Sequence, residues 1–499
     1  MTLENAVKIY KEYEEKLWGI NAATGIIYHD GNTVAPKGSA AARGRMMAVL
    51  SEQAYLLSTA PEFTEALEVI DTHKDECEKS IARAAYLYLK DARNMKKIPM
   101  DEYVEYSRHI SESSDVWHTA KETSDFALFA PYLEKTVETL RKFACYTDPD
   151  KDVYDVALDG YESGLTTQKC EEFFGAVKPV LKELIAKVAA AKAPRTDFME
   201  ENFPISKQKE LAEYITDLMC IDRDRFAIAE TEHPYTTDAS RYDVRIATHY
   251  YENSFASALY SNIHENGHAL YELGTGEEYA FTVLGGGVSM GIHESQSRFY
   301  ENILGRSLPF AKTLLPKLKE VAPAQFRDVD GETLWKALCE SKPSLIRTES
   351  DELTYTMHII IRYELENRLM HGTLAVKDLP GEWNRLYKEY LGVDVPDDKH
   401  GVLQDSHWSG GSLGYFPSYA LGSAYGAQML CKMKETIDVD GCMEKGDFAP
   451  INAWLEEEVW RHGRMYEPAE LLKNACGEEF SPKYFIDYLT EKYTKLYEL

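Results

Sequence analysis

Apolar residues recur along most of the chain at the three-to-four-residue spacing of an amphipathic helix. Charged and apolar positions alternate at this period over residues 10–18 and 132–145. The same pattern covers residues 177–191 and stops before Pro194, which cannot continue a helix. Further helices are expected over residues 83–89, 456–473 and 483–497. The chain is therefore predicted to be mainly α-helical.

Strand-like alternation is confined to one short part of the chain. Residues 226–251 contain two β-rich runs on either side of the turn-like Thr-Thr-Asp-Ala-Ser at 236–240. We expect a small antiparallel β unit here. No internal repeat, low-complexity tract or long linker divides the chain, so residues 1–499 are expected to form one domain. Glycine-rich segments at 284–287 and 408–414 are expected to be loops that close on a cleft.

The composition and charge of the chain indicate which binding partners and which cellular compartment to expect. Hydrophobic residues make up 44% of the chain and charged residues 28%, as in an ordinary soluble protein. The formal net charge of −28 disfavours binding to nucleic acid or anionic membranes. The eight cysteines include no C-x-x-C pair, which indicates free thiols in a reducing compartment. With no apolar signal region and no membrane-length apolar stretch, we expect a cytoplasmic protein.

The strongest motif is His264-Glu265-Asn-Gly-His268. On a helix, His264 and His268 lie one turn apart on the same face, so both imidazoles can reach one metal ion. Glu265 lies beside them, where it can take a proton from a metal-activated water. Asn253 or Ser254 can cap the start of this helix.

A catalytic zinc site needs a third protein ligand. A second helix is predicted over residues 289–304, and it carries Glu294, separated from His268 by 25 residues. Glu301, two turns below Glu294, competes for this role, and Glu272 is a weaker competitor. Because an H-E-x-x-H string arises by chance in roughly one or two of every hundred chains of this size, an incidental motif in a helical scaffold protein stays open on these residues alone.

Four further segments accompany this motif, in a fixed order along most of the chain. They are His233-Pro-Tyr235, Asp243-Val-Arg245-Ile-Ala247, His293-Glu294-Ser-Gln, and Gly401-Val-Leu-Gln404-Asp405-Ser-His407-Trp408, which is followed by Gly414-Tyr415-Phe-Pro-Ser-Tyr419. Together they resemble the carboxypeptidase Taq family of metallocarboxypeptidases. The family has phenylalanine at Tyr235 and threonine at Ala247. Since the family uses the segment of Ala247 near the closed end of its groove, this change affects how deeply substrate is admitted.

The resemblance implies a single metallocarboxypeptidase domain over residues 1–499, with a helical fold and a long central groove. It implies one zinc ion per chain, or cobalt or another divalent ion. It also implies peptide substrates of broad sequence, a homodimer and a cytoplasmic location. Among the three candidates for the third ligand, the resemblance favours Glu294.

In the resulting mechanism, His264, His268 and Glu294 hold the ion. Glu265 acts as the general base and then carries the proton to the leaving amine. The oxyanion that forms needs further donors, and the candidates are His233, Tyr415 and Tyr419. His407 is either an additional donor in the substrate site or a core histidine.

A carboxypeptidase must also bind the free carboxylate of its substrate, for which arginine is suited. Arg347 is the first candidate. Arg245 is the second, with an ordinary ion pair to Asp243 or Glu252 as its alternative. Arg298, one turn from Glu294, is expected to support that metal ligand. An oligopeptidase that cuts within short peptides would use the same metal residues and is the alternative peptidase.

Overall fold

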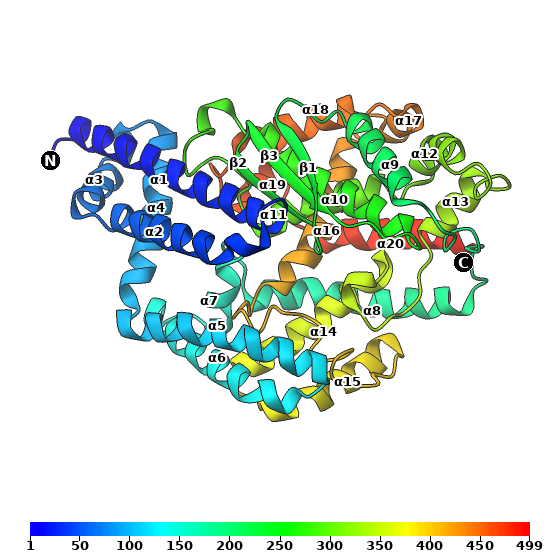
Figure 1. The fold of residues 1–499 in the computed structure, drawn as a ribbon, viewed down its shortest axis with the longest axis horizontal. Coiled ribbons are helices and arrows are strands. Elements are labelled where there is room, and N and C mark those ends of the chain that lie inside the picture. The colour runs from blue at the N-terminus through cyan, green and yellow to red at the C-terminus, as the bar shows by residue number, and fades with distance from the viewer.

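The protein, described here for residues 1–499 by a computed structural model, consists of twenty α-helices around one small sheet (Figure 1). The helices before the sheet are α1 (Leu3–Asn32), α2 (Ala40–Ser58), α3 (Pro61–Thr72), α4 (Lys79–Lys97), α5 (Met100–Thr123), α6 (Phe126–Thr147), α7 (Val153–Asp159), α8 (Thr167–Ala190) and α9 (Ile205–Leu218). The helices after it are α10 (Phe255–Gly274), α11 (Met290–Arg298), α12 (Leu308–Val321), α13 (Gly331–Leu338), α14 (Glu352–Met370), α15 (Leu379–Leu391), α16 (Phe416–Met433), α17 (Val439–Lys445), α18 (Ala449–Glu458), α19 (Pro468–Cys476) and α20 (Pro482–Tyr497). The prediction of a mainly α-helical protein is confirmed. Every helix falls short of the length and apolarity that a membrane crossing requires.

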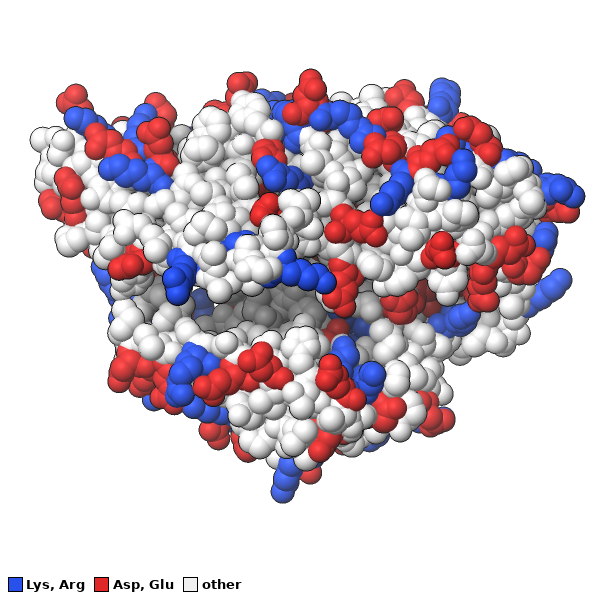
Figure 2. All heavy atoms as spheres, viewed as in Figure 1, with Lys and Arg blue, Asp and Glu red and all other residues white.

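A groove runs across one face of the molecule. Figure 2 shows it as a deep, mostly uncharged hollow, bordered on one side by α1 and α2 and on the other by α5 and α6. This is the long groove that the sequence motifs led us to expect.

The sheet differs in detail from the expected antiparallel pair. It has three strands, β1 (Phe226–Glu230), β2 (Tyr235–Ser240) and β3 (Asp243–Thr248), in the order β1-β3-β2. β1 runs parallel to β3, and β2 runs antiparallel to it. Residues 236–240, interpreted from sequence as a turn, are β2 itself. The two successive threonines there suit a strand, and only Arg241 and Tyr242 remain to turn the chain into β3.

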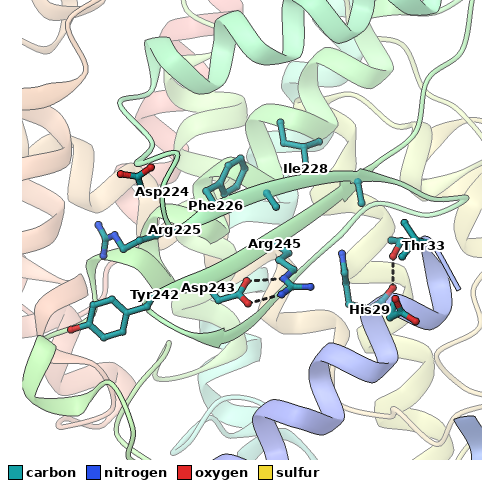
Figure 3. Close-up of a pocket in the computed structure, with 13 residues that line it drawn as sticks. His29, Thr33, Asp224, Arg225, Phe226, Ile228, Tyr242, Asp243 and Arg245 are labelled. Atoms are coloured by element: carbon teal, nitrogen blue, oxygen red, sulfur yellow. Dashed lines mark hydrogen bonds and ion pairs between the residues drawn. The ribbon is translucent and has the colours of Figure 1, made fainter.

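The two faces of the sheet have different neighbours. Val244 and Ile246 of β3 are fully buried on the face that packs against α10. Asp243 and Arg245 project from the opposite face, where they line a cavity of about 470 Å³ together with His29 of α1 (Figure 3). Residues of β3 with odd numbers therefore point away from the helix that carries the H-E-x-x-H motif.

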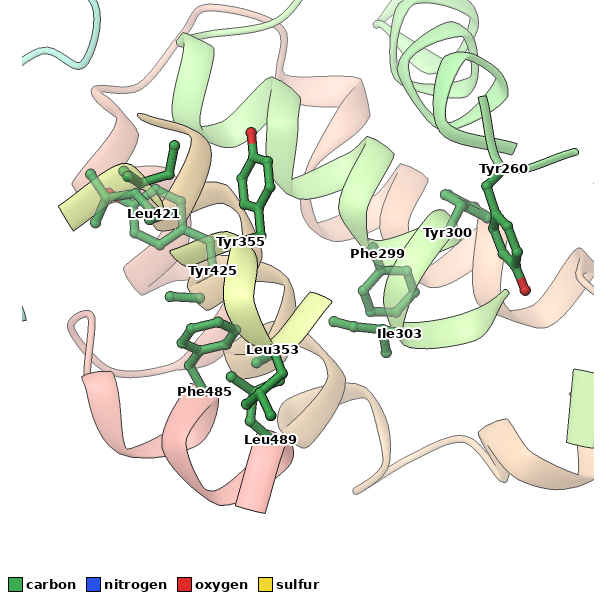
Figure 4. Close-up of a cluster of buried hydrophobic side chains, with 14 of the residues drawn as sticks. Tyr260, Phe299, Tyr300, Ile303, Leu353, Tyr355, Leu421, Tyr425, Phe485 and Leu489 are labelled. Atoms are coloured by element: carbon green, nitrogen blue, oxygen red, sulfur yellow. The ribbon is translucent and has the colours of Figure 1, made fainter. Parts of the chain in front are cut away.

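The hydrophobic core has two parts. The larger one contains 95 buried residues and extends from α5 to α20, whereas a cluster of 14 joins α1, α3 and α4 to Leu284. Figure 4 shows a region of the larger part, where side chains of α14, α16 and α20 meet those of residues 299–304. These are Phe299, Ile303, Leu353, Leu421, Tyr425, Phe485 and Leu489.

Glycines allow α11 to lie unusually close to α10 and α16. A Cβ atom on Gly267 of α10 would stand 2.8 Å from the carbonyl oxygen of Gln296 in α11. A Cβ atom on Gly422 of α16 would stand 2.7 Å from the Cβ atom of Glu294. Both distances are shorter than real carbon contacts, so only glycine permits this approach.

Two predicted helices need correction. The predicted helix over residues 456–473 is two helices, because Gly463, with a φ of +49°, and Pro468 interrupt it between α18 and α19. The predicted helix over residues 289–304 is present, but its last part, Phe299–Leu304, is a π-helical turn that ends at Gly305.

We expect Gly267→Ala to lower the stability of the protein by about 1–3 kcal/mol, because the added methyl group overlaps the backbone of α11. The matched control is Gly175→Ala in α8, where a Cβ atom meets nothing within 4 Å. Since alanine is a better helix former than glycine, the control should be as stable as the parent or up to ~1 kcal/mol more stable. Thermal unfolding of the two variants side by side checks this. Equal melting temperatures would contradict the close-packing argument.

Candidate metal centre

His264, His268 and Glu294 converge at one point between α10 and α11. Their ligand atoms all lie within 4.8 Å of one another. Oε2 of Glu294 is 3.7 Å from Nε2 of His264 and 3.7 Å from Nε2 of His268. Atoms bound tetrahedrally to one ion at zinc-ligand distances are about 3.4 Å apart, so this set fits a divalent ion. Glu301 and Glu272, the competitors for the third position, lie outside the cluster.

Glu301 instead orients the first histidine. Its Oε2 is 2.8 Å from Nδ1 of His264 and 3.2 Å from Nη1 of Arg298. Burial alone would raise the pKa of Glu301, but the charge of Arg298 and the hydrogen bond with His264 lower it to about 2. The carboxylate therefore accepts the Nδ1 proton of His264, which leaves Nε2 as the free lone pair for a metal.

His293 orients the second histidine in the same way. Nδ1 of His268 is 2.7 Å from Nδ1 of His293, and Nε2 of His293 is 2.6 Å from Oε1 of Glu272. A lone pair on Nε2 of His268 requires the proton on its Nδ1, so Nδ1 of His293 accepts and Nε2 of His293 donates to Glu272. With a metal ion on Nε2 of His268, this three-residue chain would fix the tautomer of both rings. Sequence spacing alone does not reveal this chain of contacts, although His293 belongs to one of the motifs and Glu272 lies one turn beyond His268.

The third candidate ligand is held from several sides. Nε of Arg298 donates to Oε1 of Glu294 at 2.7 Å, which is the support that the one-turn spacing suggested. The start of α11 is held by the buried carboxylate of Glu162, which accepts from the backbone N–H of Gly291 at 2.9 Å and from the hydroxyl of Tyr425 at 3.3 Å. Glu162 carries no sequence signal of its own, because its role depends on a contact 129 residues away.

Glu265 is 94% buried and lies next to the cluster on α10. Its Oε2 accepts a hydrogen bond of 2.6 Å from the hydroxyl of Thr236 in β2. The sheet therefore supplies the side chain that fixes the direction of this carboxylate. Ser254, one of the two predicted caps, occupies the N-cap position of α10 without a side-chain capping bond.

Of the other residues proposed from sequence, three come together and one does not. The ring of His407 stacks against that of Tyr415 at 5.4 Å, and its Nε2 is 3.1 Å from the hydroxyl of Tyr419. Burial and the charge of Glu294 raise the pKa of Tyr415 to about 12, so its hydroxyl remains protonated. Burial lowers the pKa of His407 to about 4, so its ring is neutral. His233 is exposed, in the loop between β1 and β2.

The two arginines proposed as carboxylate anchors have different surroundings. Arg347 is buried and donates to Oδ1 of Asp405 at 2.9 Å and to the hydroxyl of Tyr355 at 2.8 Å. Asp405 also accepts from Arg362, at 2.7 Å, so two guanidinium groups share one carboxylate and one positive charge remains in excess. Arg245 forms a two-point ion pair with Asp243, on the sheet face opposite α10.

A helical fold with a groove, a two-histidine and one-glutamate cluster, and a buried glutamate beside it define a metal-dependent peptidase. The chain belongs to the carboxypeptidase Taq (M32) family of metallopeptidases, whose profile matches residues 9–493. It is thus a metallocarboxypeptidase of this family, and an incidental motif in a scaffold protein is no longer an alternative.

Relatives match the chain from end to end. Carboxypeptidase 1 of Bacillus subtilis (strain 168) is 40% identical over 501 residues, which cover 100% of both chains. The crystal structure of the M32 carboxypeptidase from Deinococcus radiodurans R1 has a TM-score of 0.96 at 33% identity, covering 99% of this chain and 100% of that chain. Trypanosoma cruzi metallocarboxypeptidase 1 has a TM-score of 0.92 at 32% identity, covering 98% and 99%.

We expect His293→Phe to weaken metal binding by about 10–100-fold, because His268 loses the acceptor that fixes its protonation. Competition with a chromogenic chelator measures the affinity. His371→Phe is the control, since His371 pairs with Asp152 at the surface. Unchanged affinity in His293→Phe would show that the chain from His268 to Glu272 does not orient the ligand.

Proposed function

We propose that the protein removes C-terminal residues from peptides of varied sequence with one zinc ion, or cobalt or another divalent ion, held by His264, His268 and Glu294. The observation that carries this proposal is the direction of the ring nitrogens. Both Nδ1 atoms are engaged by hydrogen bonds, whereas both Nε2 atoms face the carboxylate of Glu294. Such an arrangement favours a cation over a hydrogen-bonded cluster.

Glu265 is the proposed general base. A divalent ion held by His264, His268 and Glu294 would lower the pKa of a coordinated water towards neutrality and would polarise the scissile carbonyl. The hydrogen bond from Thr236 occupies Oε2 of Glu265, so Oε1 is the oxygen left to take the water proton. The same carboxyl group then donates this proton to the leaving amine.

Tyr415, Tyr419 and His407 are the proposed donors to the oxyanion. The raised pKa of Tyr415 keeps its hydroxyl a donor. Tyr419 lies on α16, the helix whose Gly422 packs against Glu294. His407 is hydrogen-bonded to Tyr419 and stacks against Tyr415, so the three proposed donors lie together. His233 is retained as a candidate because it leads into β2, the strand that holds Glu265 through Thr236.

Arg347 is the proposed anchor for the C-terminal carboxylate of the substrate. The excess positive charge of the Arg347–Asp405–Arg362 group is buried, which strengthens its attraction for an anion. The Arg347 guanidinium also lies 5.0 Å from the ring of Tyr419, so the anchor adjoins the proposed oxyanion donors. Arg245 is the weaker candidate, because it faces away from α10.

The remaining parts of the proposal concern the protein as a whole. We propose that residues 1–499 act as a single catalytic domain, that the chain forms a homodimer as its family resemblance implies, and that it works in the cytoplasm. The eight unpaired cysteines and the net charge of −28 support a reducing compartment and peptide partners rather than nucleic acid or membranes.

Replacing Glu265 by glutamine should lower kcat by about 10²–10⁴-fold while the metal content stays near one ion per chain. Glutamine keeps the size and the acceptor for Thr236 but cannot take a proton. Steady-state kinetics with metal analysis of the same preparation tests this. Near-normal turnover in a fully loaded Glu265→Gln variant would exclude this residue as the base.

Amidation of the C-terminus of a peptide should reduce kcat/KM by about 10–100-fold, because the charge-assisted bond to Arg347 is lost. Digests of matched free and amidated peptides, with and without a chelator, can be followed by mass spectrometry. Stepwise loss of C-terminal residues, abolished by chelator, is the expected result. Internal cleavage at equal rates on both peptides would favour the oligopeptidase alternative.

A further inference from the structure

We infer that Glu366 is a positioning residue that holds the loop of residues 408–414 and thereby fixes the places of His407 and Tyr415, the two proposed functional side chains at the ends of this loop. The inference rests on the proposed roles of His407 and Tyr415. Glu366 lies on α14, is completely buried, and belongs to none of the motifs found in the sequence.

The carboxylate of Glu366 binds both ends of the loop. Oε1 accepts from the indole Nε1 of Trp408 at 2.6 Å, and Oε2 accepts from the backbone N–H of Gly414 at 2.8 Å. The hydroxyl of Tyr154 in α7 also donates to Oε2, at 2.7 Å. Trp408 directly follows His407, and Gly414 directly precedes Tyr415, so each loop contact is one residue from a proposed functional side chain.

The backbone of the loop turns at glycines. Three of its seven residues are glycines, and Gly411 and Gly414 adopt φ angles of +75° and +94°. At Gly414, a Cβ atom would stand 2.9 Å from the backbone of Ala157. This chain conformation is open to glycine alone, and glycine is also the residue with the most conformational freedom to lose. The backbone hydrogen bonds within the loop join near neighbours, whereas the carboxylate of Glu366 attaches both of its ends to α14.

The electrostatics of Glu366 argue against a role in stability alone. No cation lies within ion-pair distance of the carboxylate, and burial raises its pKa to about 7. A buried, unpaired carboxylate is costly compared with a neutral or apolar side chain of similar size. A carboxylate has two oxygens that can both accept hydrogen bonds, and three donors converge on those of Glu366.

Glutamine cannot reproduce this arrangement in either orientation. If its NH₂ group takes the place of Oε1, it faces the N–H of Trp408. If the NH₂ group takes the place of Oε2, it faces the N–H of Gly414. In both cases one end of the loop meets a donor instead of an acceptor, although the volume of the side chain is unchanged.

The test compares Glu366→Gln with Tyr154→Phe, which removes only the contact to α7. In Glu366→Gln we expect kcat to fall by about 10–100-fold with KM and metal content nearly unchanged, because the reacting groups are misplaced while the ion is kept. The indole N–H resonance of Trp408, assigned by its loss in Trp408→Phe, should shift. Tyr154→Phe should retain kcat within about twofold, since the loop keeps both its hydrogen bonds to Glu366.

Full activity of Glu366→Gln with an unshifted Trp408 resonance would overturn the inference. If Glu366→Gln fails to fold, Trp408→Phe provides the decision, because it removes one loop contact and leaves the carboxylate in place. A normal kcat in that variant would overturn the inference, and a several-fold lower kcat at unchanged metal content would support it.

Tyr415→Phe separates the inference about Glu366 from the proposed role of Tyr415. Its normal activity would remove the proposed role of Tyr415, whereas the Trp408 resonance of Glu366→Gln would still report whether Glu366 holds the loop.

Discussion

The close approach of α11 to α10 and α16 is the constraint on which the rest of the structure depends. Gly267 and Gly422 remove the side chains that would separate these helices, and Glu294 can therefore reach the face of α10 that carries His264 and His268. The sheet joins this arrangement through the hydrogen bond from Thr236 of β2 to Glu265 of α10.

Charged side chains around this contact are paired with one another or with backbone groups of α11. Arg298 bridges Glu294 and Glu301, and the latter reaches His264. Glu162 holds the first turn of α11. Glu294 and Glu162 are buried, and Arg298 and Glu301 are nearly so, which makes each charge costly without its partner. Pre-organisation of this kind is what a metal centre needs, because ligands that are already oriented lose less freedom when the ion binds.

The part of this arrangement that depends on local spacing could be predicted from the sequence. A one-turn interval gave the pair His264 and His268, and the same rule gave the support of Glu294 by Arg298. Interactions between distant segments could not be predicted in this way. Thr236 was interpreted as part of a turn, and its bond to Glu265 depends on a strand pairing that periodicity does not reveal. Glu301 and Glu272 compete with Glu294 for the third ligand position on spacing alone. The geometry shows instead that Glu301 binds Nδ1 of His264 and that Glu272 binds Nε2 of His293.

The π-helical turn at Phe299–Leu304 has a consequence for how the protein can change in evolution. Such a turn holds one residue more than an α-helical turn. A one-residue deletion there would allow regular α-helix to form, and the segments on either side would keep nearly the same rotation, because the turn already holds the extra residue. The residues inside the turn would change place, and Glu301 would lose its contact with Nδ1 of His264 while the hydrophobic composition of the segment stayed almost the same. The fold would therefore survive such a deletion more easily than the support of His264 would.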